Sequence, residues 1–223
     1  MGHFNRLFWS AFAIALLLLF STPAFADVEL YMQPPTLDGV FYASQNDVGG
    51  FGNFATVYDN FQIYQMKPYY LDDVEWFGGY WNGSGNVITG WTISIYADAG
   101  LQPGGVLWSQ YFSVAHVGYM ESCNLPNSMC AYDMDNIVGG YKLMPFTTYW
   151  ISVVPDITFP PQWGWGTGMM GDNLSYQDFF GARNPLDVDM AFNVQGVTPE
   201  PGSMILLGTG ILGLAGTLRR RLL

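Results

Sequence analysis

Apolar and polar side chains alternate along several stretches between residues 27 and 198, and this period of two constrains the fold most. The clearest stretches are Trp91–Tyr96 and Val188–Gln195, in which nearly every second residue is apolar. Successive side chains of a strand point to opposite faces, so these stretches are half-buried β-strands. No useful length of chain in this region has the 3.6-residue period of a helix, which predicts an all-β domain.

Turn-forming residues separate further candidate strands. Glycine, asparagine and proline gather at 82–86, 98–105 and 155–161, and these residues favour tight turns. Strands joined by such turns, without helical crossovers, indicate an antiparallel β-sandwich with jelly-roll-like connections. The other candidate strands are Val28–Met32, Val40–Ser44, Val57–Tyr64, Leu71–Trp81, Val106–Val114, Ile137–Met144 and Tyr149–Val154.

The first 26 residues have the three-zone order of a secretory signal peptide. Arg6 precedes an almost wholly apolar run over 7–20, and Ala24 and Ala26 place small residues before Asp27. The alternative is a membrane anchor, but the run is shorter than the roughly 20 residues that a spanning helix needs. We therefore expect a signal helix that is cleaved between Ala26 and Asp27.

The C-terminal segment, residues 198–223, has a second three-part order. It contains Pro199, Glu200 and Pro201, then an uncharged stretch over 203–218, and then the cluster of Arg219, Arg220 and Arg221. An apolar stretch before a basic cluster stays in the membrane with its arginines in the cytoplasm. This order predicts a short C-terminal transmembrane helix that associates the chain with the membrane.

These C-terminal residues closely resemble the PEP-CTERM sorting signal of Gram-negative bacteria. The resemblance implies an exported protein that is processed by an exosortase, a transpeptidase-like membrane enzyme. It also implies a place in the cell envelope, on the outer surface or in the extracellular matrix, in association with extracellular polysaccharide and biofilm. Because a sorting signal indicates only destination, the function of residues 27–197 has to be argued from that domain's own residues.

The central domain is strongly acidic. Between residues 27 and 198, 17 acidic side chains are accompanied by three basic ones. This charge repels nucleic acid and anionic lipid, so we expect no nucleic-acid partner. An acidic surface suits divalent cations, but solubility alone is the more common reason for it.

Structural calcium is the one cofactor that the residues suggest, because Ca²⁺ takes six to eight oxygens from carboxylates and carbonyls. Asp98 and Asp172 lie in glycine-containing loops and are the candidate metal ligands. Asp and Asn also form turns by binding their own backbone, and turn chemistry favours that role at both positions. We otherwise expect no cofactor.

Cys123 and Cys130 are the two cysteines of the chain. Exported proteins form disulfides in oxidising compartments, so we expect this pair to bond and to close a polar loop. Two buried free thiols are the alternative, which such a compartment disfavours. Metal ligation is weaker still, because His116 is the single histidine after the signal segment.

Catalytic motifs of triad hydrolases, zinc proteases and phosphate-binding loops do not occur in the sequence, and His116 alone offers a histidine base. A glycosidase instead needs two carboxyl groups that face each other across a sugar. We predict no catalytic residue and no enzyme, and keep a glycoside-acting enzyme as the weakest alternative. The paired carboxylates are Asp72, Asp73 and Glu75; Asp133 and Asp135; and Asp187 and Asp189.

Two tryptophans form the most suggestive binding feature. Trp163 and Trp165 stand two residues apart in a glycine-rich loop, so an extended chain would place both on one face. Sugar rings stack on such aromatic faces, which makes exopolysaccharide a candidate ligand of exposed tryptophans. Large aromatics are usually buried, however, and the favoured interpretation is that both residues cap the core.

A weaker resemblance concerns one hairpin. The segment Gly90–Ser113 resembles jelly-roll domains of other exported bacterial proteins through Ile93–Asp98 and the turn at Pro103 and Gly104. Together these features predict an exported protein with a non-catalytic structural or adhesive β-sandwich. A carbohydrate-binding module is the alternative.

Overall fold

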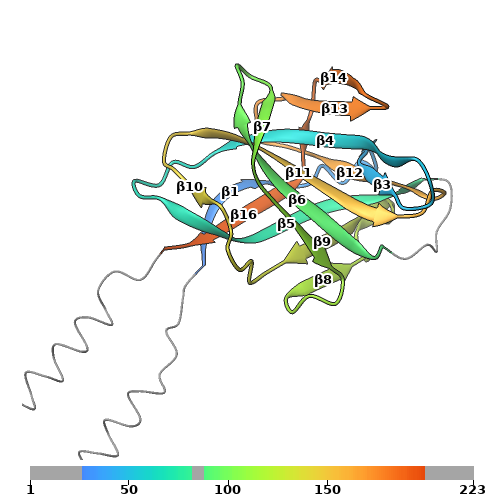
Figure 1. Cartoon of the computed structure of the whole chain (residues 1–223), viewed down its shortest axis with the longest axis horizontal. Coiled ribbons are helices and arrows are strands. Elements are labelled where there is room, and N and C mark those ends of the chain that lie inside the picture. The colour runs from blue at the N-terminus through green and yellow to red at the C-terminus, as the bar shows by residue number, and fades with distance from the viewer. Residues whose placement is uncertain (1–26, 82–87, 199–223) are drawn as a thin grey trace, which may run out of the picture.

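The computed structural model of this chain describes residues 27–81 and 88–198. Nearly all regular structure in these residues is β-strand, and the strands form two sheets that pack against each other (Figure 1). This arrangement confirms the all-β sandwich that the alternation predicts. The strands are β1 (Val28–Gln33), β2 (Phe41–Ala43), β3 (Gln45–Asp47), β4 (Gly52–Gln62), β5 (Tyr69–Trp81), β6 (Gly90–Asp98), β7 (Pro103–Ser113), β8 (Tyr119–Ser122), β9 (Cys130–Met134), β10 (Lys142–Leu143), β11 (Thr148–Ile157), β12 (Gln162–Gly168), β13 (Ser175–Phe179), β14 (Ala182–Leu186), β15 (Asp189–Met190) and β16 (Phe192–Val197).

The larger sheet has nine of the described strands and follows the order β1-β16-β5-β12-β15, with β9 and β10 also paired to β5, β8 to β9, and β2 to β12. The smaller sheet has seven and follows the order β14-β13-β4-β3-β11-β6-β7. Most neighbours are antiparallel, whereas β3 and β11 run parallel. The jelly-roll connectivity stays a prediction.

Helical structure is scarce in the part of the chain that the structure describes. It consists of one 3₁₀ turn, η1 (Pro126–Ser128), and no described helix is long and apolar enough to cross a membrane. The predicted signal helix in residues 1–26 and the predicted membrane helix over 203–218 lie outside the described residues.

The strands with the clearest alternation form where the sequence predicts them. Trp91–Tyr96 lies within β6, and Val188–Gln195 contains β15 and the start of β16. The strand predicted over Ile137–Met144 is mostly wrong, because only its residues in β10 pair with β5. A turn precedes β10, with Gly139 at a φ of 77°, a conformation that glycine adopts most readily.

Both sheets contribute to an aromatic cluster at the centre of the sandwich. Trp76, Tyr132 and Trp163 come from the larger sheet, and Trp91 comes from β6 of the smaller one. The ring centroid of Trp91 lies 4.8 Å from those of Trp76 and Tyr132, and 5.0 Å from that of Trp163. All four side chains are fully buried, and each ring contact adds about 0.5–1.5 kcal/mol beyond area burial. The cluster therefore holds the sheets together.

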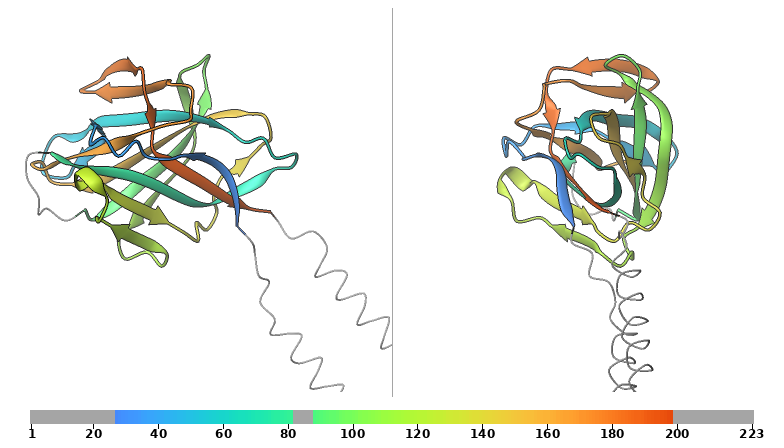
Figure 2. Two further views of the ribbon diagram at one scale, coloured as in Figure 1. Left: turned by 180° about the vertical axis from the view of Figure 1, so that it is seen from behind. Right: turned by 90° about the vertical axis from the view of Figure 1, so that its left-hand side faces the viewer.

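The two ends of the described chain lie side by side. Val28 at the start of β1 pairs with Gly196 near the end of β16, and both strand ends sit at one end of the sandwich (Figures 1 and 2). The turn between β3 and β4 lies at the opposite end. The sandwich therefore has an end next to both termini and an end remote from them.

Replacement of Trp163 tests the role of the aromatic cluster. Trp163→Ala should lower the free energy of unfolding by about 3–5 kcal/mol, because it leaves a cavity among three other rings. Urea denaturation of the full chain measures this loss. Tyr111→Ala, at a half-exposed position on β7, serves as the control and should change the free energy by less than about 1 kcal/mol. Similar losses in both variants would contradict this role.

Candidate functional site

A group of polar side chains covers the outer face of the larger sheet. Glu75 on β5 lies directly opposite Asp133 on β9 and Asn193 on β16. Asp73, two residues earlier on β5, lies opposite Gln195. The residues between them, such as Val74, point into the core instead. Alternation thus places carboxylates and amides from three strands together on one face.

The carboxylates of this face and Gln195 line a hollow of ≈ 570 Å³, here called the acidic hollow, and Asn193 is not part of its lining. A β-bulge interrupts the pairing of β5 with β16 between Asp73 and Leu71 and changes the direction of the following side chains. The residues that line the hollow are Asp73, Glu75, Met120, Glu121, Ser122, Ala131, Tyr132, Asp133 and Gln195.

The polar groups of this face are largely buried. Asp73 and Asn193 are each only 8 % exposed. The amide oxygen of Asn193 has no hydrogen-bond partner, whereas the carboxyl groups of Asp73 and Asp133 share a hydrogen bond. A buried acceptor without a donor costs about 1–3 kcal/mol.

The carboxyl groups of this face titrate abnormally. Burial, followed by a hydrogen bond and charge repulsion from Asp133, raises the pKa of Asp73 to about 9. Burial also raises the pKa of Asp133 and of Glu75. Asp73 and Asp133 therefore form a contacting pair, and like charges that close favour retention of one proton. Glycosidase carboxyls are roughly 5–9.5 Å apart, so this pair does not have that spacing.

A second surface feature is a group of five phenylalanines, here called the phenylalanine cluster. Phe54 stacks on Phe180 with ring centroids 5.2 Å apart, and Phe51 contacts Phe180 edge to face at 6.3 Å. Phe51 and Phe180 are each 63 % exposed. Phe159 and Phe179 complete the cluster. Three of the five residues lie on the turns that follow β3, β11 and β13, and Phe54 and Phe179 lie in the adjoining ends of β4 and β13, at the end remote from both termini (Figure 1).

Asp47 holds two of these turns together. One of its carboxylate oxygens accepts the backbone N–H groups of Gly49 and Phe159, at 2.8 and 2.9 Å, and the other accepts that of Phe51 at 2.8 Å. Burial alone would raise the pKa of Asp47, but these hydrogen bonds outweigh burial and lower it. One carboxylate therefore fixes the backbone beneath Phe51 and Phe159.

An aromatic hollow of ≈ 370 Å³ adjoins the phenylalanine cluster. The rings of Phe41 and Trp81 meet edge to face with centroids 5.7 Å apart. Trp81 lies against Gly164 of the neighbouring strand β12, where a Cβ would be 2.4 Å from its ring. Phe41 on β2 reaches across β12 to Gly79 of β5, where a Cβ would be 2.6 Å from its ring. The hollow is lined by Phe41, Tyr42, Ala43, Trp81, Gln162, Gln177 and Phe179.

The predicted tryptophan platform is wrong. Trp163 and Trp165 do share one face of an extended strand, β12, but that face is the core, and both indoles are fully buried. Trp163 Nε1 donates to the Tyr132 hydroxyl at 3.3 Å, and Trp165 Nε1 donates to the Ala191 carbonyl at 2.8 Å. The favoured interpretation, that both residues belong to the core, is the one that agrees with the structure.

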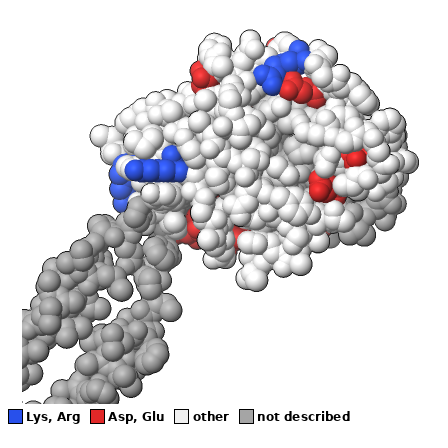
Figure 3. All heavy atoms as spheres, viewed as in Figure 1, with Lys and Arg blue, Asp and Glu red and all other residues white. Residues whose placement is uncertain are grey.

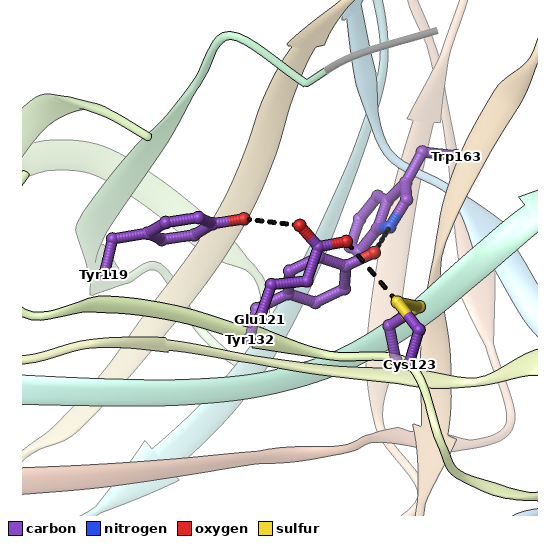
Figure 4. The surroundings of a disulfide bond; sticks show 6 residues. Tyr119, Glu121, Cys123, Tyr132 and Trp163 are labelled. Atoms are coloured by element: carbon purple, nitrogen blue, oxygen red, sulfur yellow. Dashed lines mark hydrogen bonds between the residues drawn. A yellow bond between two sulfur atoms is a disulfide. The ribbon is translucent and has the colours of Figure 1, made fainter. Parts of the chain in front are cut away.

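The predicted disulfide between Cys123 and Cys130 is present. It closes the tip of the β8–β9 hairpin beside the acidic hollow (Figure 4). The Glu121 carboxylate lies between this disulfide and the Tyr119 hydroxyl, which donates to it at 3.3 Å. The disulfide thus fixes the start of β9, the strand that carries Asp133.

Asp98 and Asp172, the two candidate metal ligands, form turns. Asp98 accepts the backbone N–H groups of Gly100 and Leu101 and the indole N–H of Trp150. Asp172 accepts the N–H of Leu174, two residues later, and the side-chain amide of Asn60. Hydrogen bonds to local backbone account for both aspartates, as turn chemistry favours.

The remaining candidate acids, Asp187 and Asp189, differ in burial, and His116 packs on an aromatic ring. Asp187 is exposed, whereas Asp189 is buried and accepts the N–H groups of Gly171 and Asn173 at 3.0 and 2.7 Å. His116 packs edge to face on Phe112, with ring centroids 5.3 Å apart. The sequence did not predict the contact between Asp73 and Asp133. The buried residues on either side of Asp133, Tyr132 and Met134, show the alternation from which strand β9 could have been predicted.

The residues predicted for cleavage and sorting lie almost wholly outside the described residues. Asp27 is the first described residue and is exposed. No structure is described for the cleavage residues Ala24 and Ala26, or for the sorting residues Pro199, Glu200, Pro201, Arg219, Arg220 and Arg221.

Comparison with known protein families decides the nature of the C-terminal segment. The family model of the PEP-CTERM protein-sorting motif matches residues 197–221. The chain carries a PEP-CTERM sorting signal. This signal indicates an exported protein of Gram-negative bacteria that is processed by an exosortase. No curated protein and no solved structure matches the chain, so the comparisons leave the activity of the β-sandwich open.

Acid should weaken the turns beneath the phenylalanine cluster. A lowered folded-state pKa means that the hydrogen bonds of Asp47 add stability above the unfolded pKa of 3.8, and that this stability is lost as pH falls below it. Asp47→Asn should cost about 1–3 kcal/mol near neutral pH and little at pH 2. Urea unfolding of the parent chain and of Asp47→Asn from pH 2 to 6 measures how their free energies of unfolding converge as the pH falls. Asp187→Asn should stay parallel to the parent chain, and a constant gap for Asp47→Asn would refute the assignment.

Proposed function

We propose that this PEP-CTERM protein is a non-catalytic adhesive or structural component of the cell envelope, outer surface or extracellular matrix. The exposed phenylalanine cluster supports this proposal most strongly. Large aromatic side chains seldom gather on the surface of a protein that has no partner, and contiguous apolar patches mark interaction sites. Aromatic residues are also enriched among the residues that dominate interface energies.

The position of the cluster agrees with an adhesive role. The sorting signal begins at residue 197, the last residue of β16, and β16 pairs with β1. The phenylalanine cluster lies at the opposite end of the sandwich (Figure 2). A chain held by its C-terminal segment would therefore direct the cluster away from the membrane. On the face shown in Figure 3, charged side chains form a few separate groups on a surface that is otherwise uncharged.

Removal of the exposed rings tests the adhesive role. Phe51→Ser with Phe180→Ser should reduce the fraction of adherent or aggregated cells several-fold, at equal amounts of exported protein, because both rings leave the surface patch. Adherent cells are counted on a washed surface, with export measured by immunoblot. Val117→Ser with Val138→Ser, at two sites that are each 83 % exposed, should leave adhesion unchanged. Equal adhesion by the phenylalanine variant and the parent would reject the proposal.

A carbohydrate-binding module is the second candidate, and the aromatic hollow supports it in place of the two buried tryptophans. The rings of Phe41 and Trp81 offer apolar surface to a sugar, and the amides of Gln162 and Gln177 offer hydrogen bonds. No charged residue lines the hollow. The expected ligand is therefore a neutral polysaccharide of the extracellular matrix.

Binding measurements separate the two candidates. Trp81→Ala in the full chain should weaken retention on immobilised neutral polysaccharides about two- to tenfold, in line with roughly 0.5–1.5 kcal/mol for a lost aromatic contact. Tyr111→Ala removes a half-exposed aromatic on β7 and should bind like the parent. Absence of binding by the parent chain to any neutral polysaccharide would eliminate the carbohydrate candidate and leave the adhesive one untouched.

A further inference from the structure

One strand at the margin of the smaller sheet has an unpaired outer side. β7 is the last strand of that sheet, and among the described strands only β6 pairs with it (Figure 1). Such an edge presents N–H and C=O groups in the geometry that a further strand requires. Because exposed edges invite pairing with another chain, proteins usually protect them with short strands, charged side chains, bulges or proline.

The other margins of the two described sheets carry this protection. β1 bears the exposed Glu29, and β8 is four residues long and bears Glu121. β14 contains Arg183 and Pro185. β2, β10 and β15 are only two or three residues long. β7 is 11 residues long, has no charged residue and has proline only at its first position, so it is the exception among the described edge strands.

The register of β6 with β7 shows which backbone groups of β7 are already used. Val114, which directly follows β7, donates its N–H to the Thr89 carbonyl at 3.2 Å, in the same register as the ladder. Hydrogen-bonded pairs alternate along an antiparallel ladder. Every second residue back from Val114 therefore directs its N–H and C=O to β6. These residues are Phe112, Gln110 and Trp108.

The residues between them, Ser109 and Tyr111, direct their backbone groups to the open side of β7. Both residues are exposed, and no residue in the described part of the chain bonds to these backbone groups. A bulge at Leu107 precedes them, and the carbonyl of Ser113, beyond them, accepts the N–H of His116. The free edge is therefore short and lies around Gln110.

We propose that β7 pairs with β7 of a second copy of this chain, antiparallel, about a two-fold axis at Gln110. In this register Ser109 of each copy stands opposite Tyr111 of the other. The free N–H of each residue would donate to the free C=O of its opposite, so every free backbone group of both residues gains a partner. The side-chain amides of the two Gln110 residues meet on the axis, where each can donate to the other.

Charge favours a second copy as the occupant of this edge. The central domain has 17 acidic and three basic side chains between residues 27 and 198, so two copies repel each other over most of their surfaces. Residues 99–120, which include β7, contain no Asp, Glu, Lys or Arg. The one charged residue of β6 is Asp98, opposite Pro103 at the far end of β7. Two acidic copies can meet here without like charges, whereas a basic partner would find no opposite charge.

Pairing of this kind ends at two copies. An edge that pairs with itself about a two-fold axis is closed, because the same strand is consumed in both copies. The bulge at Leu107 shortens the edge and increases its twist, which limits the paired length. The association is therefore weak and depends on concentration, as for other small interfaces.

Cysteine substitution on the axis tests the pairing in the exported full chain. Opposite residues without backbone hydrogen bonds between them have Cα atoms about 4.5 Å apart, which a disulfide spans. Under mild oxidation, Gln110→Cys should give covalent dimers in at least about fivefold higher yield than Gln102→Cys, because only the first site lies on the axis. Gln102 is an exposed glutamine in the turn between β6 and β7 and is the matched control. Non-reducing gels measure both yields.

Three results of this experiment would reject the proposal. Equal dimer yields from the two variants would mean that contact between copies is random. A Gln110→Cys adduct with a different protein, in place of the dimer, would mean that a strand of another protein occupies the edge. Absence of any adduct at Gln110→Cys would mean that the edge is unoccupied.

Charge exchange at the same position provides a second measurement that needs no cross-link. Gln110→Glu and Gln110→Lys each place like charges opposite one another and should weaken self-association about two- to fivefold. An equimolar mixture of the two should restore it, because unlike charges then meet across the axis. Sedimentation of the full chain in detergent measures the association, and the same changes at Gln102 should leave it unaltered.

The parent chain itself can contradict the proposal in this measurement. A parent that stays monomeric up to about 100 µM has no such interface, even a weak one. An association that neither Gln110 variant weakens belongs to another surface. Because adhesion by the phenylalanine cluster involves other residues, failure of the β7 pairing leaves the proposed function untouched.

Discussion

The packing of tryptophans between the two sheets decides where the other side chains of the domain lie. A Cβ at Gly78 would stand 2.2 Å from the Trp163 ring, so only glycine lets this indole enter the core. Since Trp163 points inward, its neighbour Gly164 faces outward, where the ring of Trp81 covers it. One alternating strand therefore builds the core on one face and the aromatic hollow on the other. The core and this surface cannot vary independently.

The sequence predicted the fold class because burial on one face leaves a period of two in strands such as β6. It failed for β12, where Gly164 and Gly166 occupy the outward positions and make the strand resemble a loop. Glycine is normally unfavourable in strands, but here it receives the rings of neighbouring strands. It also failed before β10, since the apolar residues Ile137 and Val138 precede a turn. Local composition does not reveal which partner a segment packs against.

The candidate sites were less predictable than the fold, because they depend on strand pairing. Asp73 and Asp133 are far apart in sequence and meet only because β5 pairs with β9 in one register. The bulge at Asp72 decides which neighbouring carboxylate enters the hollow, and alternation alone gives no sign of it. By contrast, local rules sufficed for Asp98, whose hydrogen bonds go to backbone two and three residues later. Cysteine pairing was predictable because only one pairing exists.

Export and charge bear on each other in this chain. The sorting signal indicates a protein that functions outside the cytoplasm. A domain with 17 acidic and three basic side chains is repelled by anionic membrane surfaces. For a chain held by its C-terminal segment, that repulsion would favour an upright sandwich over one that lies on the bilayer. In that position the same charge would help to direct the phenylalanine cluster outward.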